Sequence, residues 1–126
     1  MKIGSRIRRR IHRRILSPAI QVSEEELEEM LNKAVEEFER QFDVQLQSTG
    51  YEDSDEDRFS REYMVKGLIE SNYVNIDVGG WFDIYSDGTG NCNLAILIDG
   101  EPVSETHALV SYYDGERWDE IAWEAM

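Results

Sequence analysis

The sequence predicts an α+β fold, in which one amphipathic helix packs on an antiparallel β-meander of about four or five strands. Three observations predict it. Apolar residues recur at 3–4 spacing within residues 24–41, they alternate with polar residues after residue 73, and glycine-containing turns separate the later segments. The chain has 126 residues, which fits one domain with a core that needs no disulfide. We divide it into a basic arm, residues 1–18, and an acidic α+β domain, residues 19–126.

The arm is predicted to be an amphipathic helix. Seven of the 13 basic residues of the chain lie in residues 1–16, and no acidic residue accompanies them. Isoleucines recur every fourth residue, which forms a ridge along a helix. The isoleucines are Ile3, Ile7, Ile11 and Ile15, and the basic residues are Lys2, Arg6, Arg8, Arg9, Arg10, Arg13 and Arg14. Because clustered arginines repel and isoleucine is a middling helix former, we expect the arm to need a surface to fold against.

The rest of the chain has the opposite charge. Residues 17–126 contain six basic and 27 acidic residues, a formal charge of −21, and the whole chain carries −14. Only three of the basic residues in the chain are lysines, and acidic residues make up about a fifth of it. This composition resembles that of proteins from salt-loving archaea and their viruses.

A helix is predicted from about Glu24 to Gln41. Ser23 and Glu26 match a capping box, and acidic residues in the first turn favour the helix dipole. The apolar face consists of Leu27, Leu31, Ala34, Val35, Phe38 and Phe42.

The segment between this helix and residue 73 is less clearly patterned. Alternation at residues 42–46 predicts a short strand, and the acidic run 52–57 predicts a solvated loop. Ser60 is a candidate N-cap for a short third helix that runs to about Glu70. Because Gly67 disfavours a helix, a strand is the alternative.

From Tyr73 the pattern predicts a β-meander. Gly79-Gly80 indicates a turn or bulge, residues 86–90 a turn, and Asp99-Gly100 a tight hairpin. Residues 92–98 form a strand with Cys92, Leu94, Ile96 and Ile98 on one face. The return strand reaches Tyr113 with a break near Pro102, and the last segment places Trp118, Ile121 and Trp123 against the sheet.

No complete catalytic or ligand motif is present, and we predict no enzyme activity, no cofactor and no metal. The glycine-rich segment 86–90 lacks the Lys-Ser/Thr pair and the following helix of a phosphate loop. The acidic run 52–57 lacks the glycine and distal glutamate of an EF-hand. Cys92 is predicted to be a buried, inert thiol, and His12 and His107 offer no metal pair.

Five aromatic residues are numerous for so short a sheet and are candidates for a contact surface: Trp81, Tyr85, Tyr112, Tyr113 and Trp118. Neighbours in a strand point to opposite faces, so Tyr112 and Tyr113 cannot both lie in the core. Exposed aromatic residues on a sheet often mark a contact surface.

The charge layout favours a non-enzymatic assembly protein. We expect a virion component, at a head, neck or tail position, of a halophilic archaeal virus. Its arm would dock on a neighbouring copy, on another assembly protein or on nucleic acid. The alternative is a soluble acidic inhibitor that mimics DNA, of the anti-CRISPR or anti-restriction type. A third interpretation is a peripheral membrane protein, although the arm lacks the aromatic residues frequent in such helices. No apolar run is long enough to cross a bilayer and no signal peptide is evident, so we expect a virion or cytoplasmic location.

Overall fold

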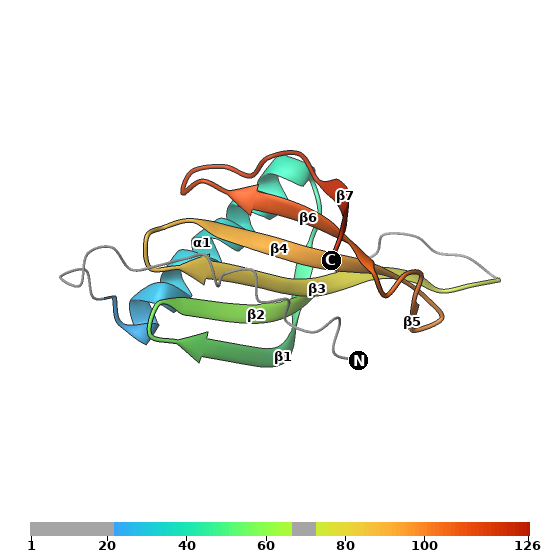
Figure 1. Ribbon diagram of the computed structural model, residues 1–126, viewed down its shortest axis with the longest axis horizontal. Helices are drawn as coiled ribbons and strands as arrows, with labels where there is room; N and C mark the ends of the chain where they lie inside the picture. Colours follow the sequence, from blue (N-terminus) through green and yellow to red (C-terminus); the bar gives the residue numbers. More distant parts are fainter. Residues whose placement is uncertain (1–21, 67–72) are drawn as a thin grey trace.

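The computed structural model describes residues 22–66 and 73–126, which form one helix and seven strands of a single antiparallel sheet (Figure 1). The elements are α1 (Glu24–Phe42), β1 (Leu46–Asp55), β2 (Arg58–Val65), β3 (Ile76–Tyr85), β4 (Gly90–Ile98), β5 (Glu101–Pro102), β6 (His107–Tyr113) and β7 (Ala122–Ala125). The strand order is β1-β2-β3-β4-β6-β7, and β5 pairs with β4. The predicted α+β class is confirmed, but the sheet has more strands than the expected four or five.

Helix α1 has the predicted start and nearly the predicted end. The Ser23 hydroxyl accepts a hydrogen bond from the Glu26 N–H at 3.1 Å, and the Glu26 carboxylate accepts one from the Ser23 N–H at 3.3 Å. These bonds satisfy two N–H groups that lack partners within the helix. The helix ends at Phe42, one residue later than predicted, because Asp43 takes a left-handed conformation with φ of 54°.

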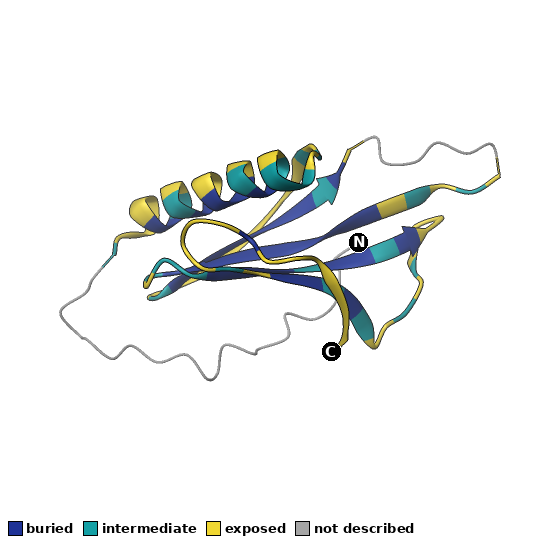
Figure 2. Cartoon of the chain, turned by 90° about the horizontal axis from the view of Figure 1, so that it is seen from above, coloured by how far each residue is buried: buried dark blue, intermediate teal, exposed yellow. Residues whose placement is uncertain are grey.

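The core lies between α1 and one face of the sheet (Figure 2). Helix residues Leu27, Leu31, Ala34, Val35 and Phe38 are buried, as the 3–4 spacing predicts. The Phe38 ring meets the rings of Phe82 and Trp118 edge-to-face, at centroid distances of 5.0 and 5.3 Å. Such pairs add stability beyond the apolar area that they bury.

The structure of residues 46–65 differs from the sequence prediction. The acidic run 52–57 belongs to strand β1 and its turn, and residues 58–65 form strand β2, not a helix. Phe59, Arg61, Tyr63 and Val65 face α1, while Ser60, Glu62 and Met64 face the other way, which is the alternation of a strand. The alternation is hard to recognise because β2 is buried on both faces and its polar residues are buried with it. The strand expected at 42–46 begins only at Leu46, and the rest of the predicted third helix, residues 67–70, lies outside the described residues.

Gly79 and Gly80 make neither a turn nor a bulge; they lie inside β3 in regular pairing with β4. A Cβ atom on Gly80 would stand 1.9 Å from the carbonyl oxygen of Asn93, and one on Gly79 would stand 2.2 Å from the sulfur of Met64. Glycine is therefore needed here for close approach of neighbouring groups, not for a positive φ.

The predicted turns at 86–90 and at Asp99-Gly100 are confirmed. Asp99 and Gly100 both have positive φ, 51° and 84°, as a two-residue hairpin requires. The break near Pro102 is also confirmed, since β5 ends there and β6 begins at His107.

The predicted faces of the later segments are only partly correct. Cys92 and Leu94 are buried, but Ile98 is 40% exposed near the end of its strand. Trp118 is buried, whereas Ile121 and Trp123 are largely exposed. Trp123 lies in β7 and its ring stacks on that of His107, with centroids 5.8 Å apart. The sheet extends past the helix here, so α1 does not cover these side chains.

Strand β1 forms one edge of the sheet. Every residue after Leu46 is exposed, and the pairing with β2 is interrupted by an irregularity between Ser48 and Glu52. Three acidic residues, Glu52, Asp53 and Asp55, follow the irregularity. Charges and bulges of this kind are common on exposed edge strands.

Candidate interaction surface

The face of the sheet opposite α1, here called the far face, gathers polar, aromatic and apolar residues in register. Ser60, Asp83, Asn91 and Tyr112 are paired across β2, β3, β4 and β6 and form one row. The next row across the same four strands consists of Glu62, Trp81, Asn93 and Val110. Paired residues point to the same face, so these rows lie side by side. The described residues form one helix, α1, and it covers only the other face of the sheet (Figure 2).

Three of the five candidate contact aromatics lie on the far face. Trp81 and Tyr85 come from β3 and Tyr112 from β6, and the Asn91 side chain donates a hydrogen bond to the Tyr85 hydroxyl at 3.3 Å. Trp81 and Tyr85 are only 4% and 2% exposed, whereas Tyr112 is 49% exposed. Of these three candidate contact aromatics, Tyr112 is therefore the exposed one, and Trp81 and Tyr85 are buried.

An ion cluster around the buried Arg58 occupies the end of the far face next to the β1–β2 turn. The Arg58 guanidinium lies 2.8 Å from a carboxylate oxygen of Asp55 and 3.2 Å from one of Asp53. It also donates to the Ser60 hydroxyl, which donates in turn to Asp83. Burial opposes the charge of Arg58, but its hydrogen bonds and the attraction of these carboxylates raise the pKa of the guanidinium above its ordinary value.

The far face carries more acid than base among the described residues. Glu62, one position along β2 from the Arg58 cluster, is 1% exposed, and its carboxylate accepts a hydrogen bond from the Thr49 hydroxyl at 2.7 Å. Asp83 is 2% exposed. Asp53, Asp55 and Asp83 place three carboxylates within 4.0 Å of the Arg58 guanidinium.

A second ion cluster joins α1 to β1 on the helix side. Arg61 donates to Glu52 at 2.7 Å and to Asn32 at 2.9 Å, and it also contacts Glu28. Burial opposes its charge, but the hydrogen bonds that it donates to Tyr63 and Glu52 raise the pKa of the guanidinium well above its ordinary range. The start of α1 and the β1–β2 hairpin consequently lie together, with the acidic runs 24–29 and 52–57 at the same end of the molecule.

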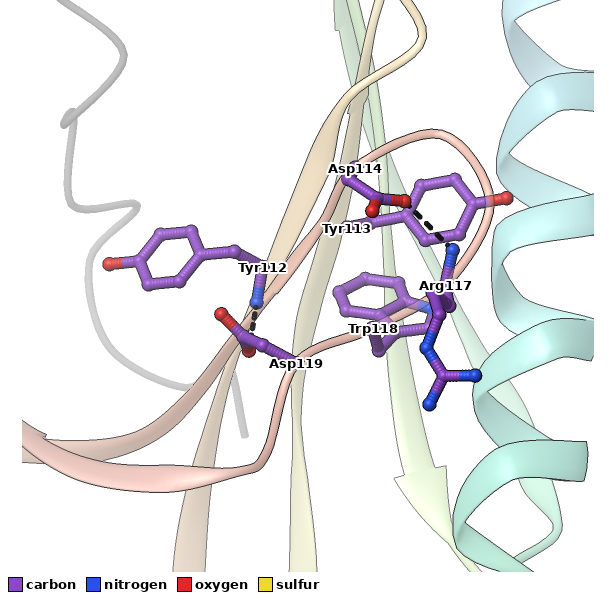
Figure 3. Close-up of a pocket in the computed structure, with 6 residues that line it drawn as sticks. All are labelled: Tyr112, Tyr113, Asp114, Arg117, Trp118 and Asp119. Carbon is purple, nitrogen blue, oxygen red and sulfur yellow. Dashed lines mark hydrogen bonds between the residues drawn. The ribbon is translucent and has the colours of Figure 1, made fainter.

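The two remaining candidate aromatics belong to a hollow at the β6–β7 loop (Figure 3). Tyr113 and Trp118 line it with Arg117, and its volume is about 320 Å³. Trp118 is 1% exposed and its indole N–H donates to the Ala34 carbonyl at 2.8 Å, so it is a core residue and not a contact aromatic. Burial, reinforced by nearby acids such as Glu37, raises the pKa of the Tyr113 hydroxyl. Tyr112 points to the opposite side of β6, as strand geometry requires (Figure 3).

The cysteine and the histidine of the described residues, Cys92 and His107, both pack against neighbouring groups of the fold. Cys92 is fully buried, and burial raises the pKa of its thiol far above the ordinary value, so it stays protonated at neutral pH. The His107 ring is stacked on Trp123. Within residues 22–66 and 73–126, no group of three or more His, Cys, Asp or Glu side chains is arranged to hold a metal ion. No helix in this part of the chain is both long and apolar enough to span a bilayer.

The arm residues predicted as the binding element, Lys2 to Ile15, lie outside the described residues. The geometry of the rest defines an α+β domain with one helix-covered sheet face and one polar, aromatic and acidic face. Comparisons with protein-family models, with curated proteins and with solved structures gave no match.

Proposed function

We propose that this chain is a non-enzymatic assembly protein that joins copies of itself, or other assembly proteins, through the basic arm. The assembly that we propose is a virion of a halophilic archaeal virus, with the protein at a head, neck or tail position. The observation that carries the proposal is the separation of charge between arm and body.

The described body leaves most of its acid on the surface and little of its base. Residues 22–66 and 73–126 contain 26 acidic and six basic side chains. Arg58 and Arg61 are buried within ion clusters, so only Lys33, Arg40, Lys66 and Arg117 are exposed cations in this part of the chain. Of the acids only Glu62 and Asp83 are buried, which leaves 24 at least partly exposed. Two such bodies repel each other, while the arm of one, with a formal +7, is attracted to the body of the next.

The isoleucines of the arm determine how the proposed docking depends on salt concentration. At molar salt the Debye length is only about 3 Å, so exposed charges attract weakly. Burial of Ile3, Ile7, Ile11 and Ile15 would then supply most of the free energy of docking, at about 25 cal/mol for each Å² removed from water. An arm with regularly spaced isoleucines among its arginines suits assembly in both dilute and concentrated salt.

The experiment compares the mass of the full-length protein with that of two variants by light scattering, at low and at high salt. Replacing Ile7 and Ile11 by Asp should abolish assembly at both salt concentrations, because it places charge in the apolar ridge. Replacing Ile98 and Ile121 by Asp is the matched control, since these are exposed isoleucines of the body. Assembly of the arm variant to the parental mass would refute the proposal.

The same experiment separates docking on protein from docking on nucleic acid. If the arm binds phosphates, changing Arg8, Arg9 and Arg13 to Gln should weaken binding more than the isoleucine changes do. Affinity for a DNA duplex should then fall steeply as salt rises, because each neutralised phosphate releases counterions.

One observation favours the second candidate, a soluble inhibitor that mimics DNA. The acidic runs 24–29 and 52–57 lie at one end of the molecule, where Ser54 donates a hydrogen bond to Glu24 at 3.0 Å. Closely spaced carboxylates can imitate the phosphates of a duplex before a basic nucleic-acid-binding enzyme. Co-purification of one nuclease in a fixed ratio, weakened by Glu25→Gln with Glu29→Gln, would support this candidate over assembly.

A further inference from the structure

We propose that strand β7 is a dimerisation edge, at which two copies of this chain pair their β7 strands antiparallel and join their two sheets into one. The proposed function assigns association to the arm, whereas this second contact between copies is formed by residues that the structure describes. Because each copy uses the same strand, the contact closes on itself as a two-fold dimer.

The outer side of β7 carries backbone groups that no described strand pairs with. β7 ends the strand order of the sheet, and all four of its residues are exposed. On the inner side the Met126 N–H donates to the carbonyl of the opposite residue, Thr106, at 2.8 Å. Hydrogen-bonded and non-hydrogen-bonded pairs alternate along an antiparallel ladder. The N–H and C=O groups of Trp123 and Ala125 therefore point outward, away from β6.

The side chains at this edge suit burial against another strand. Trp123 is 43% exposed and Ile121 is 36% exposed. Trp123 lies opposite the half-buried Leu109, on the side of the sheet that α1 covers only in part. β7 contains no proline or lysine, and its ladder with β6 is regular. These are the devices that commonly block an exposed edge, so β7 is open to pairing.

The outward groups select one register for two copies. Residues that exchange hydrogen bonds must both point outward, so odd-numbered residues face odd-numbered residues of the partner subunit. A two-fold axis at Trp123 uses the whole strand, and it places Ala125 opposite Ile121 of the partner subunit. Glu124 then lies opposite Ala122 of the partner subunit, so the acid of β7 does not face its own copy. Like charges directly opposite each other would destabilise the pairing.

A second β7 fits this edge better than the other exposed edge of the sheet does. Strand β1 carries Glu52, Asp53 and Asp55, and its ladder is irregular between Ser48 and Glu52. A β1 strand would therefore bring several acids alongside Glu124 and would interrupt the new ladder. β7 offers a regular strand with uncharged residues on both sides of its single acid. The partner that matches the edge is thus a second copy of this chain.

The dimer should be weak on its own. One pair of short strands buries much less than the roughly 800 Å² per partner of a standard interface. The bodies of both copies are also acidic, and salt that screens their repulsion should strengthen the pairing. A covalent trap placed at the junction therefore detects this contact better than a measurement of mass.

The test is disulfide formation between copies of the full-length protein under mild oxidation. Trp123→Cys places its thiol on the two-fold axis, where opposite Cα atoms stand about 5.5 Å apart, within the range of a disulfide. Val103→Cys is the matched control, since Val103 is 54% exposed but lies outside β7. We expect Trp123→Cys to form covalent dimers about tenfold faster or more, because paired copies hold the two thiols at a high effective concentration. The native Cys92 is buried and does not compete.

Two changes at Ala125 test the backbone pairing itself. Ala125→Pro removes an outward N–H that β6 does not use, and proline is tolerated at such positions of an edge strand. Ala125→Val keeps the N–H. Added to Trp123→Cys, the proline should remove the rate advantage over Val103→Cys, and the valine should preserve it.

Equal rates for Trp123→Cys and Val103→Cys, with both proteins folded by circular dichroism, would overturn the proposal. A rate for Trp123→Cys that Ala125→Pro leaves unchanged would overturn it as well. If Trp123→Cys does not fold, a mixture of the Ile121→Cys and Ala125→Cys proteins replaces it, since the register places these positions opposite each other and Trp123 is kept. Crosslinking no faster in the mixture than in either protein alone would then refute the dimer.

The crosslinking result is independent of the arm. Adding Ile7→Asp and Ile11→Asp should leave the preference for position 123 over position 103 intact, because the arm does not form the junction. Failure of the assembly experiment and failure of this one are therefore distinguishable.

Discussion

The side-chain amide of Gln41, in the last turn of α1, pairs with both backbone groups of Trp118. Its oxygen accepts a hydrogen bond from the Trp118 N–H at 2.9 Å, and its nitrogen donates to the Trp118 carbonyl at 2.5 Å. The Trp118 indole donates to the Ala34 carbonyl in the same helix. Three hydrogen bonds thus fasten the β6–β7 loop to the helix and hold the indole ring in the core.

Gln41→Ala should lower the free energy of unfolding by about 1–3 kcal/mol, because it leaves the backbone groups of Trp118 without their partners in a partly buried place. The measurement is urea unfolding followed by tryptophan fluorescence. Gln45→Ala is the control, since Gln45 is exposed and only its backbone carbonyl makes a hydrogen bond across the fold. Equal midpoints for the two variants would show that the amide does not hold the loop.

Phe38→Ala should cost about 3–5 kcal/mol, because Phe38 is 1% exposed and joins α1 to the rings of Phe82 and Trp118. Thermal unfolding monitored by circular dichroism would measure it. Tyr51→Ala removes a ring that is 54% exposed and should change the midpoint little. A Phe38 variant that melts with the parent would mean that the helix does not pack as described.

Cys92 should resist thiol reagents as long as the protein is folded. Its thiol is fully buried and its pKa is raised, so the reactive thiolate is scarce and inaccessible. With Ellman's reagent at neutral pH, we expect one equivalent to react at the rate of unfolding, and at once in denaturant. Glu116→Cys adds an exposed thiol and should react rapidly without denaturant. Fast reaction of the parent protein would contradict the buried position.

Asp114 should make a stabilising contribution that disappears in acid. Its carboxylate accepts hydrogen bonds from the Arg117 N–H at 2.9 Å and from the Glu116 N–H at 2.8 Å, and these bonds lower its pKa below the ordinary value. A carboxylate with a lowered pKa in the folded state stabilises the fold above its unfolded pKa of about 3.9, and this contribution is lost as the pH falls through the folded value.

Asp114→Asn should therefore be less stable than the parent at pH 7, and the difference should shrink as the pH falls below about 4. Urea unfolding of both proteins over a series of pH values tests this. A difference that stays constant down to the acid limit would indicate that the charge of Asp114 is irrelevant to the turn.

Local signals predicted much of this fold, and the errors arose where pairing between strands decides the outcome. The capping box at Ser23 and the Asp99-Gly100 hairpin depend on neighbours in the sequence, so they were predicted correctly. The run 52–57 looked like a solvated loop because the sequence does not show that Arg58 and Arg61 neutralise part of it across the hairpin. Gly80 looked like a turn residue because the group that requires a glycine there, the Asn93 carbonyl, lies on another strand and cannot be seen in the local sequence.

The candidate surface was predictable only as a list of aromatic residues. Which of them share a face follows from the registers that pair Trp81 with Asn93 and Asn91 with Tyr112, and composition does not fix a register. Glu62 and Asp83 carried no signal at all, because nothing nearby in the sequence distinguishes a buried carboxylate from a solvated one.

Strand β1, finally, limits the ways in which copies of this protein can associate. An exposed edge normally invites another strand to pair with it, and unlimited pairing of that kind yields fibres. Glu52, Asp53 and Asp55 line this edge, and a second strand could pair with it only by bringing its backbone against these charged side chains. The charged residues and the pairing irregularity of β1 together oppose association of two copies through this edge.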